Sequence, residues 1–455
     1  MSSLWITRRT IAIPYADPTI KRILRCLLSA ALDECDPSLS ISRTLHLDKH
    51  RFYAKDFLYD LTHVNRVVCI GAGKASGRMA AELEHVLGDT LEGGIVIVTD
   101  GYGANSQKIQ IIEAGHPMPD RRGVSATKRI LSLIQSLTRK DLLIILLSGG
   151  ASSLLCAPSV GLTLKDKQRT TGMLLRSGAT IQEMNIIRKH LSAIKGGQLA
   201  RDTTATLLTL IISDVMGDDL ATIGSGPTVS DPSTFQDAME VLKQYKIWSK
   251  VPGAVRRHLQ KGHANKIPET LKPTTHGALR NRHLILANNR LALDGVAKAA
   301  RQLKLKPFLL PLTLQGEAKE IGSILGALAR DLVVFGNPVR PPACLIAGGE
   351  PTVTVEGKGK GGRAQECVLA AAQELAGLKK IFVAGFGTDG IDGPTDVAGA
   401  LVDGKTVERA FRKGVDSARF LRNHDSYHFF KKIGGHIITG PTGTNVNDIY
   451  LILAL

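Results

Sequence analysis

The 455-residue chain has few aromatic side chains, few cysteines and no long apolar run. Aromatic residues make up 4% of it, which leaves little material for stacking on nucleic-acid bases, and no RRM, KH or zinc-finger pattern is present. The six cysteines are widely separated and form no CxxC pair, which argues against a disulfide framework or a zinc knuckle. No apolar run reaches the roughly 18 residues of a membrane-spanning helix. We therefore expect no membrane or zinc-dependent role.

The first residues also lack the apolar core and small-residue cleavage site of a secretory signal. Arg8 and Arg9, with no acid before Asp17, faintly resemble an organelle transit peptide, but Pro14 would interrupt its helix. We expect residues 1–17 to be a disordered leader. The expected location is cytoplasmic, with the mitochondrial matrix as the alternative in a eukaryote.

The formal net charge of +17 raises the question of a nucleic-acid partner. The excess is concentrated between Val241 and Arg340, where 18 Lys and Arg residues stand against 5 Asp and Glu residues. We interpret this segment as a solvated basic face, and attraction of small anionic substrates is the alternative. A nucleic-acid-binding regulator is the least favoured reading, so no nucleic-acid partner is predicted.

Short apolar runs alternate with segments of helical spacing along the chain. Most runs are β-branched and apolar on both faces, which is typical of parallel strands covered by helices. Strands are predicted at residues 66–70, 95–99, 109–113, 142–147, 206–212, 284–287, 343–347, 352–355, 381–384 and 436–439. Helices between them include residues 76–87, 123–136 and 363–375.

This alternation predicts the α/β class, with parallel sheets in two domains. The polar, proline-bearing segment 249–282 contains no strand-like run and is the predicted seam. The predicted N-terminal domain spans residues 18–250, and the C-terminal domain spans residues 251–455.

A glycine-rich turn, Gly71-Ala-Gly-Lys-Ala-Ser-Gly77, follows the first predicted strand. Its spacing is one residue longer than the GxGxxG dinucleotide fingerprint, and Asp100 at the end of the next strand could bind a ribose, so a dehydrogenase stays an alternative. Lys74 inside the turn favours a transferring phosphoryl group instead. A close-packed turn without any ligand is the third explanation.

Two further loops follow predicted strands. Ser148-Gly-Gly-Ala-Ser-Ser153 offers backbone N–H groups and hydroxyls, which is typical of an anion-binding nest. Ser213-Asp-Val-Met-Gly-Asp-Asp219 carries three carboxylates at a strand end, and carboxylates are ligands for a hard cation such as Mg²⁺. For Asp218 and Asp219, capping of the next segment is the alternative.

The C-terminal half repeats this pattern. Gly348-Gly-Glu-Pro-Thr352 follows a predicted strand, and a flexible loop rich in glycine and lysine, residues 357–362, delivers Arg363 at the start of a helix. Such a loop could close over phosphates, and the arginine could grip a carboxylate or phosphoryl group. A later loop carries the carboxylates Asp389, Asp392 and Asp396, for which ordinary turn formation is the alternative.

The ordered motifs GAGKAS, NIIRKHLSAIKGGQLA, SDVMGDDLATIGSGPTVSDPST, GGEPTVTV, GKGGRAQE, GTDGIDGPTDVAGALVDG and TGPTGTNVND resemble those of the class II glycerate kinases. The C-terminal part of that family is called the MOFRL domain, here about residues 338–452. The resemblance extends from about Ile20 to the C-terminus.

The resemblance implies transfer of the ATP γ-phosphoryl group to the 2-hydroxyl of D-glycerate, with Mg²⁺, in serine and glyoxylate metabolism. It also implies a Rossmann-like N-terminal domain, a smaller α/β C-terminal domain and an active site in the cleft between them. Its essential residues correspond to Lys74, Asp214 and Arg363. Lys74 would neutralise the phosphoryl group, Asp214 would hold Mg²⁺ or accept the hydroxyl proton, and Arg363 would bind a carboxylate or phosphoryl group.

The loops and the resemblance together define the predicted site. The cofactor-binding residues are Gly71, Gly73, Ser76, Gly149, Gly150, Ser152, Gly349, Glu350, Thr352, Gly361, Gly362 and Thr388. The predicted metal ligands are Asp214, Asp389 and Asp392. The predicted cofactors are ATP and Mg²⁺, and the chain is expected to be a monomer or a homodimer. An NAD(P)H-dependent hydroxypyruvate reductase is the alternative, because some relatives carry that name.

Two positions depart from the family pattern. Ala151 replaces a third glycine, and it would strain the loop if that position needs a positive φ. His436 stands where relatives commonly have Asp, and we expect it to be a partly exposed strand residue rather than a ligand.

Overall fold

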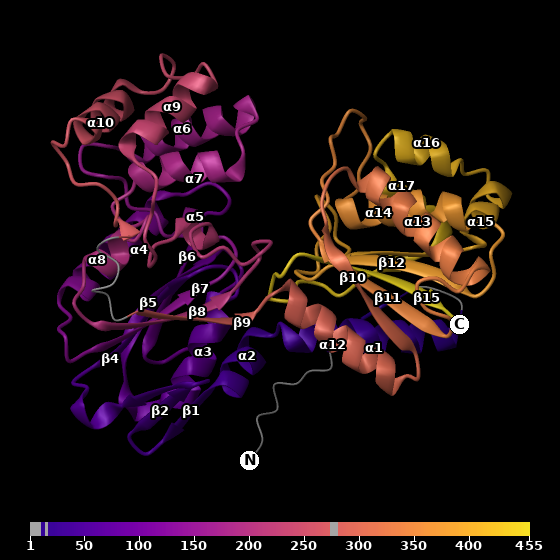
Figure 1. Ribbon diagram of the computed structural model, residues 1–455, viewed down its shortest axis with the longest axis horizontal. Helices are drawn as coiled ribbons and strands as arrows, with labels where there is room; N and C mark the ends of the chain where they lie inside the picture. Colours follow the sequence, from indigo (N-terminus) through magenta and orange to yellow (C-terminus); the bar gives the residue numbers. More distant parts are fainter. Residues whose placement is uncertain (1–10, 14–16, 274–280) are drawn as a thin grey trace. The chain divides into compact units, whose positions relative to one another are not determined.

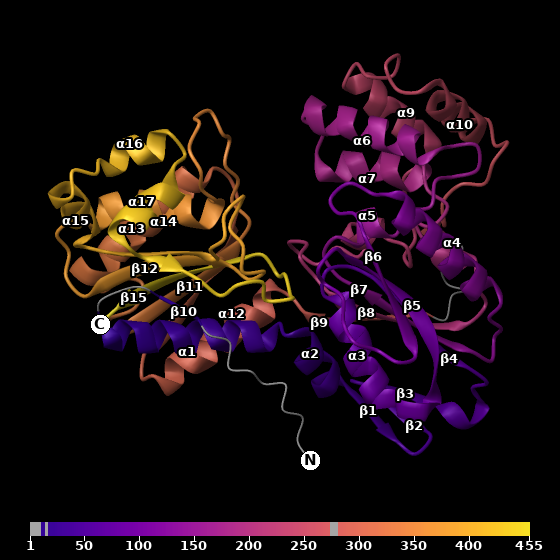
Figure 2. The same ribbon diagram turned by 180° about the vertical axis from the view of Figure 1, so that it is seen from behind.

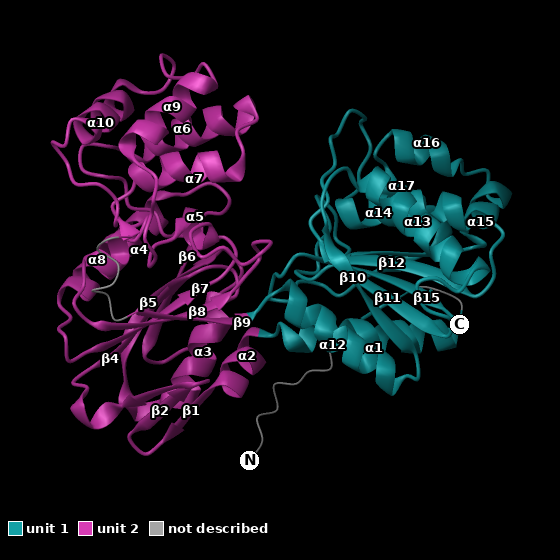
Figure 3. Ribbon diagram, viewed as in Figure 1, with its two compact units in different colours: residues 1–36, 287–455 teal, residues 37–286 magenta. Residues whose placement is uncertain are grey.

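The computed structural model describes residues 11–13, 17–273 and 281–455, and the chain forms two compact units (Figure 3). Unit 2 is Pro37–Leu286, and unit 1 combines Met1–Asp36 with Ala287–Leu455. The first helix, which the sequence prediction groups with residues 18–250, therefore lies in the same unit as the C-terminal sheet. Most of the predicted leader, residues 1–17, lies outside the described residues.

Unit 2 is built on a six-stranded sheet in the order β6-β5-β4-β7-β8-β9 (Figure 1). The pairings from β6 across to β8 are all parallel. Every residue of β4 and β7 is buried, which explains why these runs are apolar on both faces. The predicted Rossmann-like sheet is confirmed. Its strands are β4 (Val67–Ala72), β5 (Leu91–Thr99), β6 (Ile109–Ala114), β7 (Leu142–Leu147), β8 (Thr206–Ile212) and β9 (Asn281–Ala287).

The helices of unit 2 fall into two groups. Helices α3 (Ser76–Leu87) and α4 (Arg121–Gln135) pack against strands of the sheet. Helices α6 (Leu164–Ser177), α7 (Ile181–His190) and α9 (Phe235–Gln244) each begin with a Thr capping box. Together with α10 (Gly253–His263) they bury a core of their own, which includes Leu174, Ile187, Phe235, Leu242 and Leu259. Shorter elements are α2 (Pro37–Thr44), α5 (Ala151–Leu154), α8 (Gln198–Arg201), η1 (Leu61–His63), η2 (Gly88–Thr90) and η3 (Ile223–Ser225).

A small antiparallel sheet, which the sequence analysis does not predict, precedes the main sheet of unit 2. It consists of β1 (Leu45–Asp48), β2 (Arg51–Ala54) and β3 (Phe57–Asp60). Its strands are short, and every one contains exposed or half-buried positions, so they carry no continuous apolar run.

The sheet of unit 1 is mixed, with the order β10-β11-β15-β12-β13-β14. Only β10 and β11 pair in parallel, so the prediction of a second parallel sheet is wrong. The last strand, β15, lies antiparallel between β11 and β12 and is buried throughout. The strands are β10 (Lys306–Leu314), β11 (Ala343–Gly349), β12 (Ile381–Gly387), β13 (Gly399–Asp403), β14 (His436–Ile437) and β15 (Asp448–Ala454).

Helices cover both faces of this sheet, as Figures 1 and 2 show. Helices α1 (Pro18–Glu34) and α12 (Asn289–Gln302) pack together on one face, and α13 (Ala318–Val334) and α14 (Arg363–Leu375) pack together on the other. Shorter helices complete the unit: α15 (Thr406–Arg412), α16 (Ser417–Arg422) and α17 (Ser426–Ile433). The predicted strand at 352–355 is wrong, because only Thr352 forms an isolated bridge there. Within the described residues, every helix is too short or too polar to cross a membrane.

Candidate active site

Three predicted loops of unit 2 meet because β4, β7 and β8 are parallel neighbours whose carboxyl ends share one edge of the sheet. The backbone N–H of Lys74 donates to the carbonyl oxygen of Gly149 at 2.8 Å. A Cβ atom on Gly149 would overlap the carboxylate of Asp214, so these two residues touch. The fold thus brings three residues of the predicted site, Lys74, Gly149 and Asp214, to one place.

The turn between β4 and α3 is tightly braced. The N–H of Gly73 donates to Ile97 O at 3.1 Å, and the N–H of Ala75 donates to Ser148 Oγ at 3.0 Å. Ser76 is fully buried, with its Oγ 3.0 Å from Ser148 Oγ. The backbone donors of residues 73–75 are therefore used within the protein. Close packing therefore explains the backbone of the turn. The group that the turn can contribute to the chemistry of the site is the Lys74 side chain.

The loop after β7 is arranged differently. Among the backbone hydrogen bonds of the described residues, none uses the N–H of Gly149 or Gly150. Gly150 has φ 91°, whereas Ala151 starts α5 without a positive φ. Ala151 therefore fits the loop without strain. The strain considered from the sequence would arise only at a positive φ, which this position does not have. This loop offers two backbone donors beside Asp214, which suits an anionic oxygen.

His116, which the sequence analysis does not single out, lies beside the same loop. It follows β6 at the carboxyl edge, and a Cβ on Gly150 would lie 3.0 Å from its ring. Burial, followed by the positive charge of Lys74, lowers the pKa of His116 below its usual 6.5. The imidazole is therefore neutral at pH 7 and can accept a proton. A histidine just after a predicted strand was the signal available in the sequence.

Asp214 and Asp219 differ in their surroundings although both belong to the loop after β8. Asp219 Oδ1 accepts the N–H of Ala221 at 3.1 Å, and Asp219 Oδ2 accepts the hydroxyl of Thr222 at 2.5 Å. Asp219 therefore organises the turn into η3, as the capping alternative proposes. Asp214 instead faces Gly149.

In unit 1, Arg363 is held by two carboxylates. Its Nε donates to Asp448 Oδ2 at 2.7 Å, its Nη2 donates to Asp448 Oδ1 at 3.2 Å, and its Nη1 donates to Glu350 Oε1 at 2.7 Å. Arg363 is the first residue of α14, Glu350 follows β11, and Asp448 starts β15. The predicted cofactor residue Glu350 is thus a partner of Arg363, and Asp448 was not singled out although it ends the quoted motif TNVND.

Asp448 is unusual for an ion-paired carboxylate. Its side chain is buried, and burial raises its pKa from 3.8 to about 7, although the charge of Arg363 acts in the opposite direction. Burial also acts to lower the pKa of Arg363. The negative charges and hydrogen bonds of Asp448 and Glu350 outweigh this effect, so the arginine pKa is raised. Asp448 therefore titrates near neutral pH while Arg363 stays charged.

Asp392 caps helix α14. Its Oδ1 accepts the N–H of Ala364 at 3.0 Å, and its Oδ2 accepts the N–H and the side-chain amide of Gln365 at 2.8 and 2.9 Å. Asp389 Oδ1 accepts the N–H of Ile391 at 3.1 Å, which is a turn contact. The contact of Asp389 favours the turn-forming alternative for that residue, whereas Asp392 has a structural role as the cap of a distant helix. Within the described residues, no three His, Cys, Asp or Glu side chains form a group that could hold a metal ion.

The loop before α14 is tied to the segment between α16 and α17, rather than being free to close. The N–H of Gly359 donates to Asn423 O at 3.0 Å, and the N–H of Lys360 donates to Asp425 Oδ1 at 2.9 Å. The Lys360 ammonium also lies 4.6 Å from the centre of the Tyr427 ring. The expected flexible loop is thus anchored along residues 359–360.

The remaining predicted residues have contacts within their own unit. Thr388 is fully buried, and its hydroxyl donates to Asn447 O at 2.7 Å. Thr352 donates to Gly316 O at 3.3 Å, and Ser152 Oγ lies 2.8 Å from Ser225 Oγ. Close packing accounts for the absence of a Cβ at five predicted glycines, which are Gly71, Gly73, Gly349, Gly361 and Gly362. The predicted residues that the structure brings together are therefore Lys74, Gly149, Gly150, Ser152 and Asp214 in unit 2, and Arg363 with Glu350 in unit 1.

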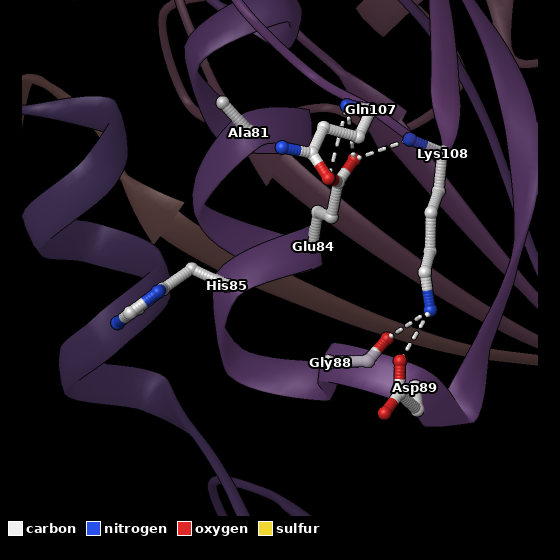
Figure 4. Close-up of a pocket in the computed structure, with 7 residues that line it drawn as sticks. All are labelled: Ala81, Glu84, His85, Gly88, Asp89, Gln107 and Lys108. Carbon is white, nitrogen blue, oxygen red and sulfur yellow. Dashed lines mark hydrogen bonds and ion pairs between the residues drawn. The ribbon is translucent and has the colours of Figure 1, made fainter.

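A surface pocket of about 360 Å³ lies at the opposite end of α3 from the Lys74 turn (Figure 4). Glu84 accepts the N–H groups of Gln107 and Lys108 at 2.9 and 3.0 Å, and Lys108 Nζ pairs with Asp89 at 3.2 Å. The charged groups Glu84, Lys108 and Asp89 are thus engaged with neighbouring groups, and the pocket lies away from the carboxyl ends of the strands. It does not form part of the candidate site.

Family models, curated relatives and solved structures match this chain over almost its whole length. Residues 23–260 match the family model described as "Domain of unknown function (DUF4147)", and residues 343–448 match the MOFRL family. The glycerate 2-kinase of Pyrococcus horikoshii is 40% identical over 438 residues, covering 95% of this chain and 97% of the relative. A protein of Agrobacterium vitis with the provisional name hydroxypyruvate reductase is 41% identical, covering 96% and 95%. The crystal structure of a Thermotoga maritima glycerate kinase is similar with a TM-score of 0.86 and 35% identity, covering 96% of this chain and all of that one.

Proposed function

Since the chain belongs to the glycerate kinase family that carries the DUF4147 and MOFRL regions, we propose that it transfers the γ-phosphoryl group of ATP to the 2-hydroxyl of D-glycerate. The products are ADP and 2-phosphoglycerate. The observation that carries the proposal is the meeting of Lys74, Asp214 and the unused N–H groups of Gly149 and Gly150 at the carboxyl edge of a parallel sheet. Phosphoryl transfer depends on positioning and charge neutralisation, and these groups supply both.

The residues of unit 2 fit a bound phosphate. Lys74 is a fixed positive charge, and the two glycine N–H groups are donors for phosphate oxygens. Asp214 lies against Gly149, where its carboxylate would accept the proton of the acceptor hydroxyl or hold Mg²⁺. Mg²⁺, when bound, neutralises charge on the phosphates. His116 is neutral and is a second proton acceptor at the same loop.

Arg363 of unit 1 is the second basic group that we assign to anion binding. Asp448 and Glu350 fix the plane of its guanidinium, so that it is oriented before a substrate arrives. Its target is the carboxylate of D-glycerate or the transferring phosphoryl group.

A reductase that uses NAD(P)H is the alternative, supported by the name of the Agrobacterium vitis relative. One contact counts against it. Asp100, the acid that would bind a ribose, forms two hydrogen bonds with Arg122 at 2.7 and 2.9 Å. That carboxylate is already engaged within unit 2.

The deciding experiment measures ADP release from ATP and Mg²⁺ with D-glycerate, with enolase added to detect 2-phosphoglycerate. Rapid ADP release with direct coupling to enolase is the expected result. ADP release without coupling would move the phosphoryl group to another hydroxyl or acceptor. No ADP release, together with loss of NAD(P)H absorbance on hydroxypyruvate, would replace the kinase by the reductase.

A further inference from the structure

Among the described residues of unit 2, two lysines are buried without a carboxylate partner. Lys167 on α6 is 7% exposed, and its Nζ has no hydrogen-bond partner in the described part of the chain. Lys195, beyond α7, is 2% exposed and donates only to neutral oxygens. These are the carbonyl and hydroxyl oxygens of Ser152, at 2.7 and 3.1 Å, and Gly224 O, at 3.3 Å.

The two lysines lie close enough to repel each other. Burial lowers the pKa of Lys195 well below its usual value, and the charges of Lys167 and Arg188 lower it further. Burial also lowers the pKa of Lys167 to about 8, with Arg188 acting in the same direction and Cys156 against it. Among the described residues, no carboxylate contributes to either pKa. Within the described part of the chain, these three basic side chains therefore share one region without a carboxylate.

The lack of a carboxylate partner is confined to this group of residues, because neighbouring buried basic side chains do have one. Lys189 on α7 is also buried, but its Nζ pairs with Asp231 at 3.2 Å. His190, the next residue, lies 3.1 Å from Glu269. Unit 2 thus provides carboxylates for other buried basic side chains. A cation left without one is costly in the free protein, and an anion brought by a ligand would remove that cost.

The cations border the loop of the candidate site. Ser152 Oγ lies 2.8 Å from Ser225 Oγ, and Ser225 donates to Asn185 Oδ1 at 3.1 Å. Ser152 therefore connects Lys195 to the same short loop whose Gly149 touches Asp214 and whose Gly150 touches His116. Four successive residues span at most about 10 Å, the size of a small ligand and its reacting group.

We propose that Lys167, Lys195 and Arg188 form a subsite for one oxyanion group of a substrate, a carboxylate or a phosphate. The Ser152 and Ser225 hydroxyls complete it as neutral donors. The identity of the ligand rests on the proposed function: the group is either the carboxylate of D-glycerate or a phosphate of ATP. The subsite holds the anion while Lys74 and Asp214 act at the reacting end.

Lys167→Met tests the subsite, because it removes the charge and keeps an apolar stem of similar length. Lys195 is unsuitable, since its loss would also release Ser152 and Gly224. Lys165→Met, an exposed lysine on the same helix, is the matched control. The full-length proteins are compared by Tm without ligand, by the Tm increase caused by D-glycerate, ADP or inorganic phosphate, and by KM for each substrate.

We expect Lys167→Met to raise the Tm of the free protein, because a buried unpaired charge is gone. It should also reduce the Tm increase caused by one anion and raise one KM at least about 10-fold, through loss of a charge-assisted hydrogen bond. An effect on D-glycerate assigns the carboxylate, and an effect on ATP and phosphate assigns the phosphate. Lys165→Met should match the wild type.

Unchanged KM values together with unchanged anion-induced Tm increases in Lys167→Met would overturn the subsite. If Lys167→Met does not fold, Arg188→Met is measured in the same way and decides by the same outcomes. A wild-type protein that does not phosphorylate D-glycerate would defeat the proposed function alone. The Tm increases caused by the anions would still decide whether the subsite exists.

Discussion

We expect ionisation of the buried Asp448 to lower the free energy of unfolding as the pH rises, and we expect Asp448→Asn to abolish this decrease. Burial raises the pKa of Asp448 from 3.8 to about 7, so the folded chain holds this proton more tightly than the unfolded chain. For a carboxyl group shifted upward, the stabilising contribution is complete below about pH 4 and is lost as the pH rises through the folded pKa. At about 1.4 kcal/mol per pH unit, the loss amounts to about 4 kcal/mol by pH 8.

Asparagine imitates the protonated carboxyl group but cannot ionise. The free energy of unfolding of the variant therefore does not contain the decrease that ionisation of Asp448 causes in the wild type. Denaturant unfolding of the wild type and the variant between about pH 4.5 and pH 8 measures the effect. The free energy of unfolding of the wild type minus that of the variant should fall by about 3 kcal/mol over this range, because about 1 kcal/mol of the total is already lost at pH 4.5.

Glu317→Gln is the control for the same experiment. Hydrogen bonds from Thr354 lower the pKa of the exposed Glu317, so its contribution appears as the pH rises through the acidic range and has the opposite sign. A difference between wild type and Asp448→Asn that stays constant from acidic to alkaline pH would refute the reasoning about Asp448.

Three further predictions concern the candidate site. Lys74→Met should lower kcat/KM for ADP release at least about 100-fold, roughly 3 kcal/mol of transition-state stabilisation, and an active variant would end its assignment. The same variant should raise the pKa of His116, measured by NMR of the ring protons, because the charge of Lys74 lowers it now; an unmoved pKa would contradict their proximity. Asp392→Ala should reduce the free energy of unfolding by about 1–2 kcal/mol through loss of the α14 cap, with an unchanged Mg²⁺ titration. A shifted titration would restore the metal role of Asp392.

The fold of unit 2 follows closely from local sequence patterns, and that of unit 1 does not. In unit 2, the apolar runs that become β7 and β8 are unambiguous, and the predicted helix 76–87 coincides with α3. In unit 1, β15 is apolar on both faces, like a parallel strand, yet it pairs antiparallel with β11 and β12. Burial on both faces produces the same residue pattern for either direction, so only the long-range pairing decides.

For the candidate site too, some residues could be predicted from the sequence and others could not. Lys74, Asp214 and Arg363 belong to motifs and could be selected from the sequence. The partners that orient them could not, because Asp448 is 85 residues from Arg363 in the chain and His116 belongs to a different loop from Lys74. Motifs also do not reveal whether a polar group is already engaged. Ser76, Thr388 and Asp392 satisfy donors or acceptors of their own unit.

The discontinuity of unit 1 affects how the chain can fold during synthesis. Unit 2 is one continuous stretch and can fold as soon as it has left the ribosome. Helix α1 precedes unit 2 in the chain, but its partner α12 appears more than 250 residues later, and α12 approaches so closely that Gly295 faces the Ala30 carbonyl. Until then the buried face of α1, which includes Ile20, Leu24, Leu27, Leu28 and Leu32, has no surface to cover it. Helix α1 is therefore an exposed amphipathic segment while unit 2 is being translated, and it is the natural point for a chaperone to hold.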